Sequence, residues 1–452
     1  MGPSRFDTVH HAEPDSFRQM LSEFAADKSP KKISLAGGMF WDEEGKIAKM
    51  DVVEKATKQL GPHIWERHGY LPTQGHASFI RQAQNLVFSE QLVQSCLSGI
   101  GPRLTSFQTV GGTGANHLGT LFLARNLRPR RVWIPHQTWE GHSRLWQRAS
   151  DFGSRGQEAL ELRFYPYHDA TNNCLDFQGM IGVLEQESEP DDILLLHACA
   201  HNPTGIDPSR EQWEAIANFC SARNIFPFFD MAYQGFASGS FDDDAWAIRH
   251  FVHGGHELCV AQTFSKSMFL YGERLGALHL VTGSTDAAAR AQSQLSRLQR
   301  DGISSPPAFG ANVASEIMSN PELRGEWQRE VGMIHKRVMT IRKALVEELT
   351  RLGTPGEWDY IEKQVGMFTC TNLTLEQIDL LKTRYHIYVR HSGRLSIAAL
   401  ANRAAVTYVA TALDTVVRET SKSHRCRVTI PGLGPRDISL KTSAADALPS
   451  QS

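Results

Sequence analysis

The chain has 452 residues and a formal net charge of −2, since 47 Lys and Arg are balanced by 49 Asp and Glu. This balance excludes the clustered basic excess of a protein that binds nucleic acid or an anionic membrane, and no apolar run approaches the roughly 18 residues of a membrane-spanning helix. The seven cysteines are scattered and contain no Cys-x-x-Cys pair, which excludes a disulfide framework or zinc ribbon and favours the reducing cytoplasm. The first 32 residues contain five acidic side chains and no apolar core segment, so they do not fit a targeting peptide. We therefore expect a cytoplasmic protein of about two to four domains.

In chain order, short apolar runs alternate with longer amphipathic segments as far as Pro306-Pro307. Strands that alternate with helices predict an α/β fold, with a mostly parallel sheet covered by helices on both faces. Ligands bind such a sheet beyond the carboxyl ends of its strands, so the polar residues after each strand are the functional candidates. The strand-like runs are 131–135, 193–197, 225–229, 258–261 and 276–281.

The pattern changes after the proline pair. A long helical stretch over 310–352 is broken near Asn320-Pro321, and the segment 371–394 predicts a helix followed by a strand at 387–390. A last helix is expected at 401–420. We therefore predict an N-terminal arm that forms part of a small domain (1–48), a large domain (49–324), the remainder of the small α/β domain (325–420), and a tail with one short strand at 426–430 (421–452).

A lysine and an arginine follow the strand at 258–261, in the segment QTFSKSMFLYGERLGAL. A lone lysine at a strand end is usually a surface residue. A buried one such as Lys266, however, can have a lowered pKa and react with a carbonyl group. The hydroxyls of Thr263 and Ser265 and the planar fork of Arg274 suit a phosphate group. The segment is therefore a candidate for carbonyl chemistry beside a bound phosphate.

Asp230 and Tyr233 follow another apolar strand, in the sequence FFDMAYQGF. An aspartate at this place could simply cap the next helix. It could also keep a pyridinium nitrogen protonated, which makes the ring an acceptor of electrons. Tyr233 lies three residues further on, where it could donate a hydrogen bond to an oxygen of the same ring.

Two further motifs follow predicted strands. HNPTG places Asn202 in a turn, and the preceding His197-x-Cys199-x-His201 spacing lacks a second ligand cluster, so we expect no metal. The glycine-rich TVGGTGANHLG (109–119) joins a strand to a helix and can hold a phosphate at the helix N-terminus. It does not fit a nicotinamide fingerprint, because the next strand ends without a carboxylate.

Together these motifs resemble the class I, fold-type I family of pyridoxal-phosphate-dependent aminotransferases that includes aspartate aminotransferase. The resemblance covers roughly residues 12–420, and HNPTG combined with SK…ER is its most specific part. The matching blocks are HGYLPTQG, QTVGGTGA, PHQTWEGH, HACAHNPTG, FFDMAYQGF, QTFSKSMFLYGERLG, RDGISSPPAFGA and SGRLSIAAL.

The resemblance implies a fold with a mostly parallel, seven-stranded-type sheet in the large domain, with pyridoxal 5′-phosphate as the cofactor. Lys266 would hold the cofactor covalently and move the proton at the substrate Cα. Asp230 would pair with the pyridinium nitrogen, with His142 and His197 behind it, and Tyr233 would bond the phenolic oxygen. The remaining cofactor contacts implied are Gly112, Thr113, Trp139, Asn202, Thr263, Ser265 and Arg274, with Tyr70 of the partner subunit.

The resemblance also implies a homodimer with shared active sites. Arg394, with Gly38, Trp139 and Asn202 nearby, would bind the substrate α-carboxylate. Arg300 of the partner subunit would meet a second carboxylate on the substrate side chain. These two arginines favour aspartate or glutamate, with 2-oxoglutarate or oxaloacetate as the acceptor.

The sequence departs from the family pattern near the substrate. Gly111 replaces a serine of the phosphate loop, and Phe17 occupies a lid position that is usually valine or isoleucine. These departures leave open an aromatic aminotransferase for tryptophan, tyrosine or phenylalanine, and also a pyridoxal-phosphate lyase or decarboxylase. The other departures are Met39 and Trp41 in the N-terminal pocket strand, and Ile303 and Ser305 beside Arg300.

Overall fold

The computed structural model describes residues 4–12, 15–61, 66, 68–95, 99–153 and 160–426. Within these ranges the large domain is built around a seven-stranded sheet with the order β2-β10-β9-β8-β7-β3-β4. Among these strands β10 alone runs antiparallel to its neighbours. The strands are β2 (Leu104–Val110), β3 (Arg131–Pro135), β4 (Glu161–Tyr165), β7 (Ile193–His197), β8 (Phe226–Met231), β9 (Leu258–Thr263) and β10 (Leu275–Val281).

The sheet confirms the α/β prediction. Strands β3 and β7 have the predicted bounds, whereas β8 and β9 extend further toward their carboxyl ends. The strand β4 was not predicted, because its residues are mostly half-buried and its apolar pattern is therefore weak. Smaller strands pair outside the main sheet as β5 (His168–Asp169) with β6 (Cys174–Leu175).

Alternate residues of the strands pack into two separate apolar layers, one on each face of the sheet. Ile193 and Leu195 of β7 pack in the layer formed with α6, α7 and α12, while Leu194 and Leu196 pack in the layer formed with α8, α9 and α11. A strand buried on both faces has no polar side, which explains its continuous apolar sequence. The helices of these layers are α6 (Gly111–Asn126), α7 (Gly141–Gly153), α8 (Phe177–Glu187), α9 (Arg210–Arg223), α11 (Trp246–His253) and α12 (Thr285–Ile303).

A third apolar layer joins the sheet to the long helix α14 (Pro321–Leu352) through the side chains of α2, α4 and α13. Asn320 caps α14 by accepting from the backbone N–H groups of Glu322 and Leu323, which explains the break predicted at Asn320-Pro321. The other large-domain helices are α2 (Asp51–Leu60), α4 (Ala77–Phe88), α5 (Glu90–Gln94), η1 (Gly101–Arg103), α10 (Phe241–Asp244) and α13 (Phe309–Ser319).

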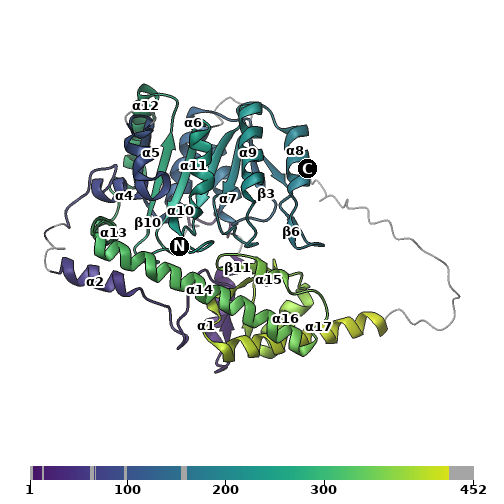
Figure 1. Ribbon diagram of the computed structural model, residues 1–452. Coiled ribbons are helices and arrows are strands. Elements are labelled where there is room, and N and C mark those ends of the chain that lie inside the picture. Colours follow the sequence, from purple (N-terminus) through teal and green to yellow (C-terminus); the bar gives the residue numbers. More distant parts are fainter. Residues whose placement is uncertain are drawn as a thin grey trace.

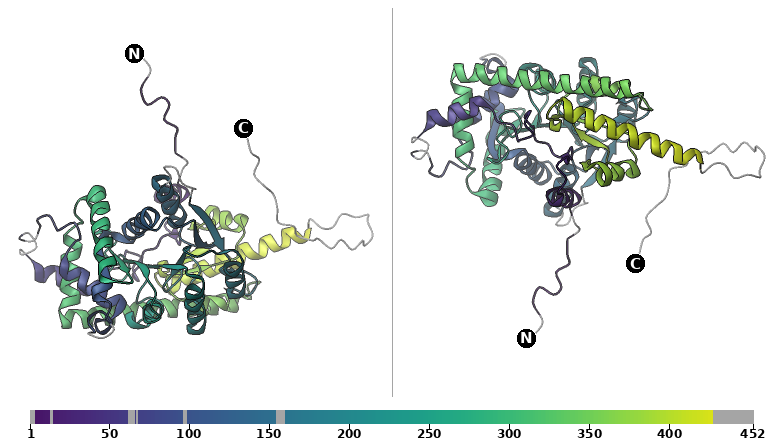
Figure 2. Two further views of the ribbon diagram at one scale, coloured as in Figure 1. Left: turned by 90° about the horizontal axis from the view of Figure 1, so that it is seen from above. Right: turned by 90° about the horizontal axis from the view of Figure 1, so that it is seen from below.

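The small domain has its own core, which contains the C-terminal half of α14 (Figure 1). Leu323 and Trp327 of α14 pack in the large-domain core, whereas Leu345 and Leu349 pack in the small-domain core. The predicted boundary at 324/325 therefore falls inside one continuous helix. Seen from below, α14 and α17 lie side by side along the small domain (Figure 2). The small-domain elements are α1 (Ser16–Ala26), β1 (Ile33–Ser34), α15 (Tyr360–Lys363), β11 (Phe368–Cys370), α16 (Leu375–Tyr385), β12 (Ile387–Tyr388), β13 (Arg394–Ser396), η2 (Ile397–Ala399) and α17 (Arg403–Cys426).

Helix α1 is held on the β1-β12 pair by a small apolar cluster in which Met20, Ala36 and Tyr388 are buried. A short strand was predicted at 426–430. The prediction is wrong for Cys426, which is the last residue of α17, and residues 427–430 lie outside the described residues. In the described part of the chain, no helix is both long enough and apolar enough to cross a membrane.

Candidate active site

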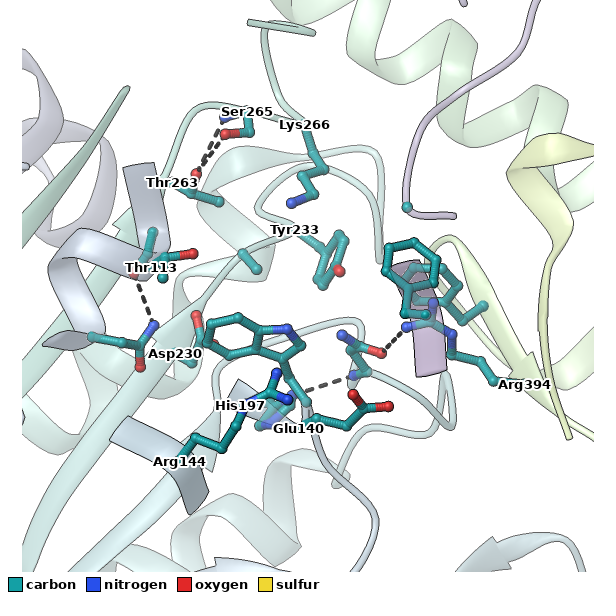
Figure 3. A pocket seen from close by; sticks show the side chains of 18 of the residues that line it. Thr113, Glu140, Arg144, His197, Asp230, Tyr233, Thr263, Ser265, Lys266 and Arg394 are labelled. Atoms are coloured by element: carbon teal, nitrogen blue, oxygen red, sulfur yellow. Dashed lines mark hydrogen bonds between the residues drawn. The ribbon is translucent and has the colours of Figure 1, made fainter. Parts of the chain in front are cut away.

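A cavity of about 290 Å³ lies at the carboxyl ends of β2, β7, β8 and β9, where it meets the small domain. All the predicted site residues except Tyr70 and Arg300 line it. Figure 3 shows Thr113, Thr263 and Ser265 on one side of the pocket and Arg394 on the opposite side, with Lys266 and Tyr233 between them. The parallel strands deliver these side chains to one edge of the sheet, as predicted.

One end of the pocket is built to hold an anion. The N-terminus of α6 presents Gly111, Gly112 and Thr113, opposite Arg274, and backbone N–H groups at a helix N-terminus favour negative charge. Gly111 has a φ of +67°, and a Cβ there would lie 2.6 Å from Nη2 of Arg274. A Cβ on Gly112 would lie 2.9 Å from Cβ of Thr263. The space between α6 and Thr263 therefore depends on Gly112, and the positive φ of Gly111 favours glycine at that position.

Lys266 follows β9 and is partly buried in the pocket. Burial lowers the pKa of its amine to about 8, with Asp230 opposing the shift and Arg274 and Arg394 adding to it. Its Nζ lies 5.6 Å from the centre of the Tyr233 ring. An amine with a pKa of about 8 has a neutral fraction of about one fifth near physiological pH, far more than an ordinary lysine, and the neutral amine is the form that reacts with carbonyl groups.

Asp230, at the end of β8, is fixed by a chain of hydrogen bonds that begins on the backbone. The N–H of Asn202 donates to Nδ1 of His197 at 3.2 Å, so the proton of this ring is on Nε2. That nitrogen lies 2.9 Å from the Thr138 hydroxyl, which lies 2.8 Å from Nδ1 of His142. The Thr138 hydroxyl therefore donates to Nδ1 of His142, and His142 donates from Nε2 to Oδ2 of Asp230 at 2.8 Å.

This series of hydrogen bonds stabilises the negative charge of the buried Asp230 carboxylate. Burial alone would raise the pKa of Asp230, but the His142 hydrogen bond and the neighbouring charges outweigh it and hold the pKa below its ordinary value. His197 stays neutral, since burial lowers its pKa to about 3. The site therefore offers one buried anion where a cationic ring nitrogen would be stabilised.

Arg394 begins β13 and is 8% exposed. It donates from Nη1 to Oδ1 of Asn202 at 3.0 Å and from Nη2 to the carbonyl of Ala36, and its Cζ lies 4.1 Å from the centre of the Phe368 ring. Among the described residues its Nε has no hydrogen-bond partner. A buried guanidinium without a carboxylate partner can receive one from a ligand.

A comparison with known proteins shows the family to which a chain with this pocket belongs. The model of the family "Aminotransferase class I and II" matches residues 30–413. The chain belongs to this aminotransferase family.

This chain aligns with most or nearly all of the length of its relatives. An L-tyrosine:2-oxoglutarate aminotransferase of Aspergillus ustus is 39% identical over 417 residues, covering 91% of this chain and 78% of that protein. The cytoplasmic aspartate aminotransferase of Schizosaccharomyces pombe is 38% identical over 417 residues, covering 92% and 98%. The solved aromatic-amino-acid aminotransferase of Burkholderia pseudomallei, covalently bound to pyridoxal phosphate, shares 37% identity at a TM-score of 0.84, covering 92% of this chain and 100% of that one.

Pyridoxal 5′-phosphate is the cofactor of this aminotransferase, and the pocket fits it. The glycine cradle with Thr263, Ser265 and Arg274 suits the phosphate, Lys266 the aldehyde, and Asp230 the ring nitrogen. The cofactor supplies an electron sink when it is bound. Within the described ranges, no group of three or more His, Cys, Asp or Glu side chains could hold a metal ion.

Two predicted residues of the aminotransferase lie away from its own pocket. Tyr70 is 99% exposed, and Arg300 is exposed near the end of α12. The two segments are joined, because Ser305 donates from Oγ to the carbonyl of Leu71 at 2.6 Å. Ser305 and Ile303 therefore belong to this exposed rim and do not line the pocket.

Two of the substitutions expected at the substrate do not line the pocket. Gly38 and Phe17 line it, but Met39 and Trp41 do not. Trp41 instead packs against the small-domain core. Met39 and Trp41 therefore do not support an aromatic pocket in this structure, and Phe17 is the departure that lines the cavity.

The structure adds residues that sequence reasoning missed. Thr138 links the two histidines behind Asp230, and its place in the block PHQTWEGH was the available signal. Phe368 supports Arg394 from a strand with no motif of its own. At the mouth of the pocket the additional charged lining residues are Asp15, Glu140, Arg144 and Arg390.

Proposed function

We propose that this aminotransferase moves an amino group between an L-amino acid and a 2-oxo acid, with aspartate or glutamate as the favoured donor and 2-oxoglutarate or oxaloacetate as the acceptor. The observation that carries the proposal is the buried Arg394, which faces the same cavity as Lys266. An α-carboxylate on Arg394 would place the α-amino group toward Lys266, and would fix the direction of the Cα–H bond.

In this proposal each polar group has one task. Lys266 holds the cofactor and moves a proton at the substrate Cα, for which its pKa of about 8 is suitable. Asp230 keeps the ring nitrogen cationic. Asn202 orients Arg394 through its Oδ1, which leaves its amide N–H groups to bind the cofactor together with Tyr233. Trp139 would cover the ring.

We further propose a homodimer in which Tyr70 of the partner subunit contacts the phosphate, and Arg300 of the partner subunit meets the distal carboxylate. Both residues are exposed here on one connected rim. The half-exposed Ile303 and Phe309 add apolar surface near them, and exposed apolar surface of this kind is typical of protein interfaces.

An aromatic amino donor is the second candidate, and Phe17 favours it. Phe17 lines the pocket from the first turn of α1, where a substrate ring could pack against it. An offset or edge-to-face pair of aromatic rings contributes about 0.5–1.5 kcal/mol beyond area burial. The relatives include both substrate types, an L-tyrosine and an aspartate aminotransferase.

The proposal is tested by mixing the holoenzyme with one amino acid at a time and recording the cofactor absorbance in a single turnover. Aspartate, glutamate, tyrosine, tryptophan and phenylalanine form the panel. Stoichiometric conversion to the pyridoxamine form supports transamination, whereas turnover without that conversion supports the lyase alternative. If tryptophan or tyrosine reacts rapidly and aspartate and glutamate do not, the dicarboxylate assignment is wrong.

We also propose a cytoplasmic location. All five cysteines with described side chains are free thiols, and four of them are buried. Free thiols are normal in a reducing compartment. Fractionation of cells expressing the full chain would test this.

A further inference from the structure

A buried glutamine lies beside the exposed Arg300 near the end of α12. Gln299 is 4% exposed, although glutamine is mostly found at protein surfaces, and it does not line the active-site cavity. Its side-chain amide donates to the carbonyl of Thr73 and, at 2.9 Å, to the carbonyl of Gln108. One side chain therefore joins three segments that are far apart in the sequence.

Gln108 belongs to β2, which is an edge strand of the main sheet. Its backbone N–H donates to the carbonyl of Gln74 at 2.9 Å, and its own carbonyl accepts from Gln299. Its buried side chain also accepts from the backbone N–H of His76 at 2.9 Å. The backbone groups that an edge strand would leave unpaired are thus bound by the segment before α4 and by the end of α12.

The segment before α4 approaches the strand so closely that it needs a glycine. Gly75 has a φ of +112°, and a Cβ there would lie 2.3 Å from Cβ of Gln108, so other residues would be strained and would clash. Gln108 also donates from Nε2 to the carbonyl of Pro307 at 2.7 Å, and Ser305 donates to the carbonyl of Leu71. These contacts hold the rim together on the sheet edge.

The hydrogen bonds of Gln299 hold the backbone next to the two residues that are assigned to the partner's site. Tyr70 lies three residues before Thr73, and Arg300 directly follows Gln299. Both side chains are exposed, so their placement depends on the backbone that carries them. A shift of about 1 Å in a group that positions a substrate can lower the rate about 100-fold.

We propose that Gln299 is a positioning residue that acts on the active site of the partner subunit. It would hold Tyr70 and Arg300 of its own chain in the geometry that the partner's site requires. The inference rests on the proposed function, because it assumes the homodimer in which these two residues enter the other subunit's pocket. Since Gln299 bonds only backbone carbonyls here, its effect should appear in the subunit that does not carry the change.

Mixed dimers with one working active site separate the two subunits. One chain carries Lys266→Ala, which removes its cofactor anchor, so the working site combines Lys266 of one chain with Tyr70 and Arg300 of the other. The two chains are coexpressed with different affinity tags, and the mixed dimer is isolated by both tags. Gln299→Met keeps the approximate length of the side chain but leaves two carbonyls without their donor.

The readout is the ratio of kcat/KM for glutamate over glutamine, which has nearly the same shape but no distal charge. Gln299→Met on the Lys266→Ala chain should lower this ratio about tenfold, because Arg300 is displaced. On the chain that keeps Lys266, it should change the ratio less than about twofold. Gln294→Met on the Lys266→Ala chain is the matched control, because Gln294 is an exposed residue of the same helix, and its ratio should not change.

Two further measurements support the comparison. Apoenzyme of the mixed dimer, titrated with pyridoxal 5′-phosphate until activity returns, should need more cofactor when Gln299→Met is on the Lys266→Ala chain, since Tyr70 is displaced as well. Gln299→Asn keeps an amide that is one methylene shorter, and should give a smaller loss in the same placement. It also provides a milder variant if Gln299→Met does not fold.

Equal losses in the two placements would show that Gln299 only stabilises its own chain, and would overturn the inference, as would an unchanged ratio in both. Arg300→Asp on the Lys266→Ala chain tests the proposed function separately. If Arg300→Asp lowers the ratio and Gln299→Met does not, the role of Gln299 alone is wrong. If Arg300→Asp also leaves the ratio unchanged, the shared active site of the proposed function is wrong.

Discussion

The two ends of the active-site pocket are built differently. At the cofactor end, Asp230 is buried near the end of β8 and Lys266 is partly buried just after β9, so the sheet fixes the neighbourhood of both. At the mouth, Phe17 and Arg390 come from α1 and a small-domain turn, and Glu140 is half-exposed. This difference teaches that the chemistry of the site is set by the large domain, whereas the choice of substrate is set by segments that are less constrained.

The comparison predicts that variants at the cofactor end lower the reaction rate equally for all substrates. The largest effect is expected for Lys266→Ala. This change removes both the covalent anchor and the group that moves the proton, and should lower kcat by at least about 10⁴-fold. Single-turnover absorbance with aspartate and with tyrosine checks it. Turnover at the wild-type rate would remove the basis of the whole assignment.

Asp230→Ala should have the next largest effect. Breaking a buried charge pair costs about 3–5 kcal/mol, which corresponds to roughly 10²- to 5 × 10³-fold in the rate of Cα deprotonation. Because the phosphate contacts remain, cofactor occupancy should change far less than this rate. An unchanged rate of deprotonation would show that Asp230 has only a structural role, and Asp230→Glu should recover part of the loss.

At the rim, variants should instead separate one substrate from another. Arg300→Asp removes a cation and adds a like charge near the distal carboxylate, so kcat/KM for aspartate should fall by about 10²- to 10³-fold. Phenylalanine should lose less than about tenfold, because it makes no ion pair there. Equal losses for the two substrates would place Arg300 outside substrate recognition.

The acidity of Lys266 gives a prediction about pH for the cofactor end. Burial lowers the pKa of this amine to about 8, so the reactive neutral form is lost as the pH falls below that value. The rate of cofactor incorporation into the apoenzyme should therefore rise about tenfold per pH unit up to about 8 and then level off. Free lysine mixed with the cofactor is the control, and its rate should keep rising to about pH 10.

The smallest expected effect is that of Phe17→Val. Losing one aromatic contact should lower kcat/KM for tyrosine or tryptophan about 3- to 10-fold. Aspartate should lose only about twofold, because it has no ring to pack there. A larger loss for aspartate than for tyrosine would show that Phe17 does not pack against the substrate ring.

The same contrast explains how far the sequence could predict the structure. Lys266, Asp230 and Asn202 were predictable because each lies at or shortly after the carboxyl end of an apolar strand, and parallel strands bring these ends together. Arg390 was not, because its neighbours Phe17 and Glu140 are distant in sequence and meet it only when both domains are assembled. Met39 and Trp41 were misplaced because a residue-by-residue resemblance does not show which side chains line the cavity.

Helix α14 gives the molecule a mechanical property that follows from its length. It has 32 residues, which corresponds to about 48 Å at 1.5 Å per residue. Its first turns are fixed in one core and its last turns in the other, so it acts as a lever arm. A tilt of about 5° at the large-domain end would move the far end by about 4 Å, given that length. A small change of angle in the large-domain core would therefore produce a displacement of several ångströms where α14 packs in the small-domain core.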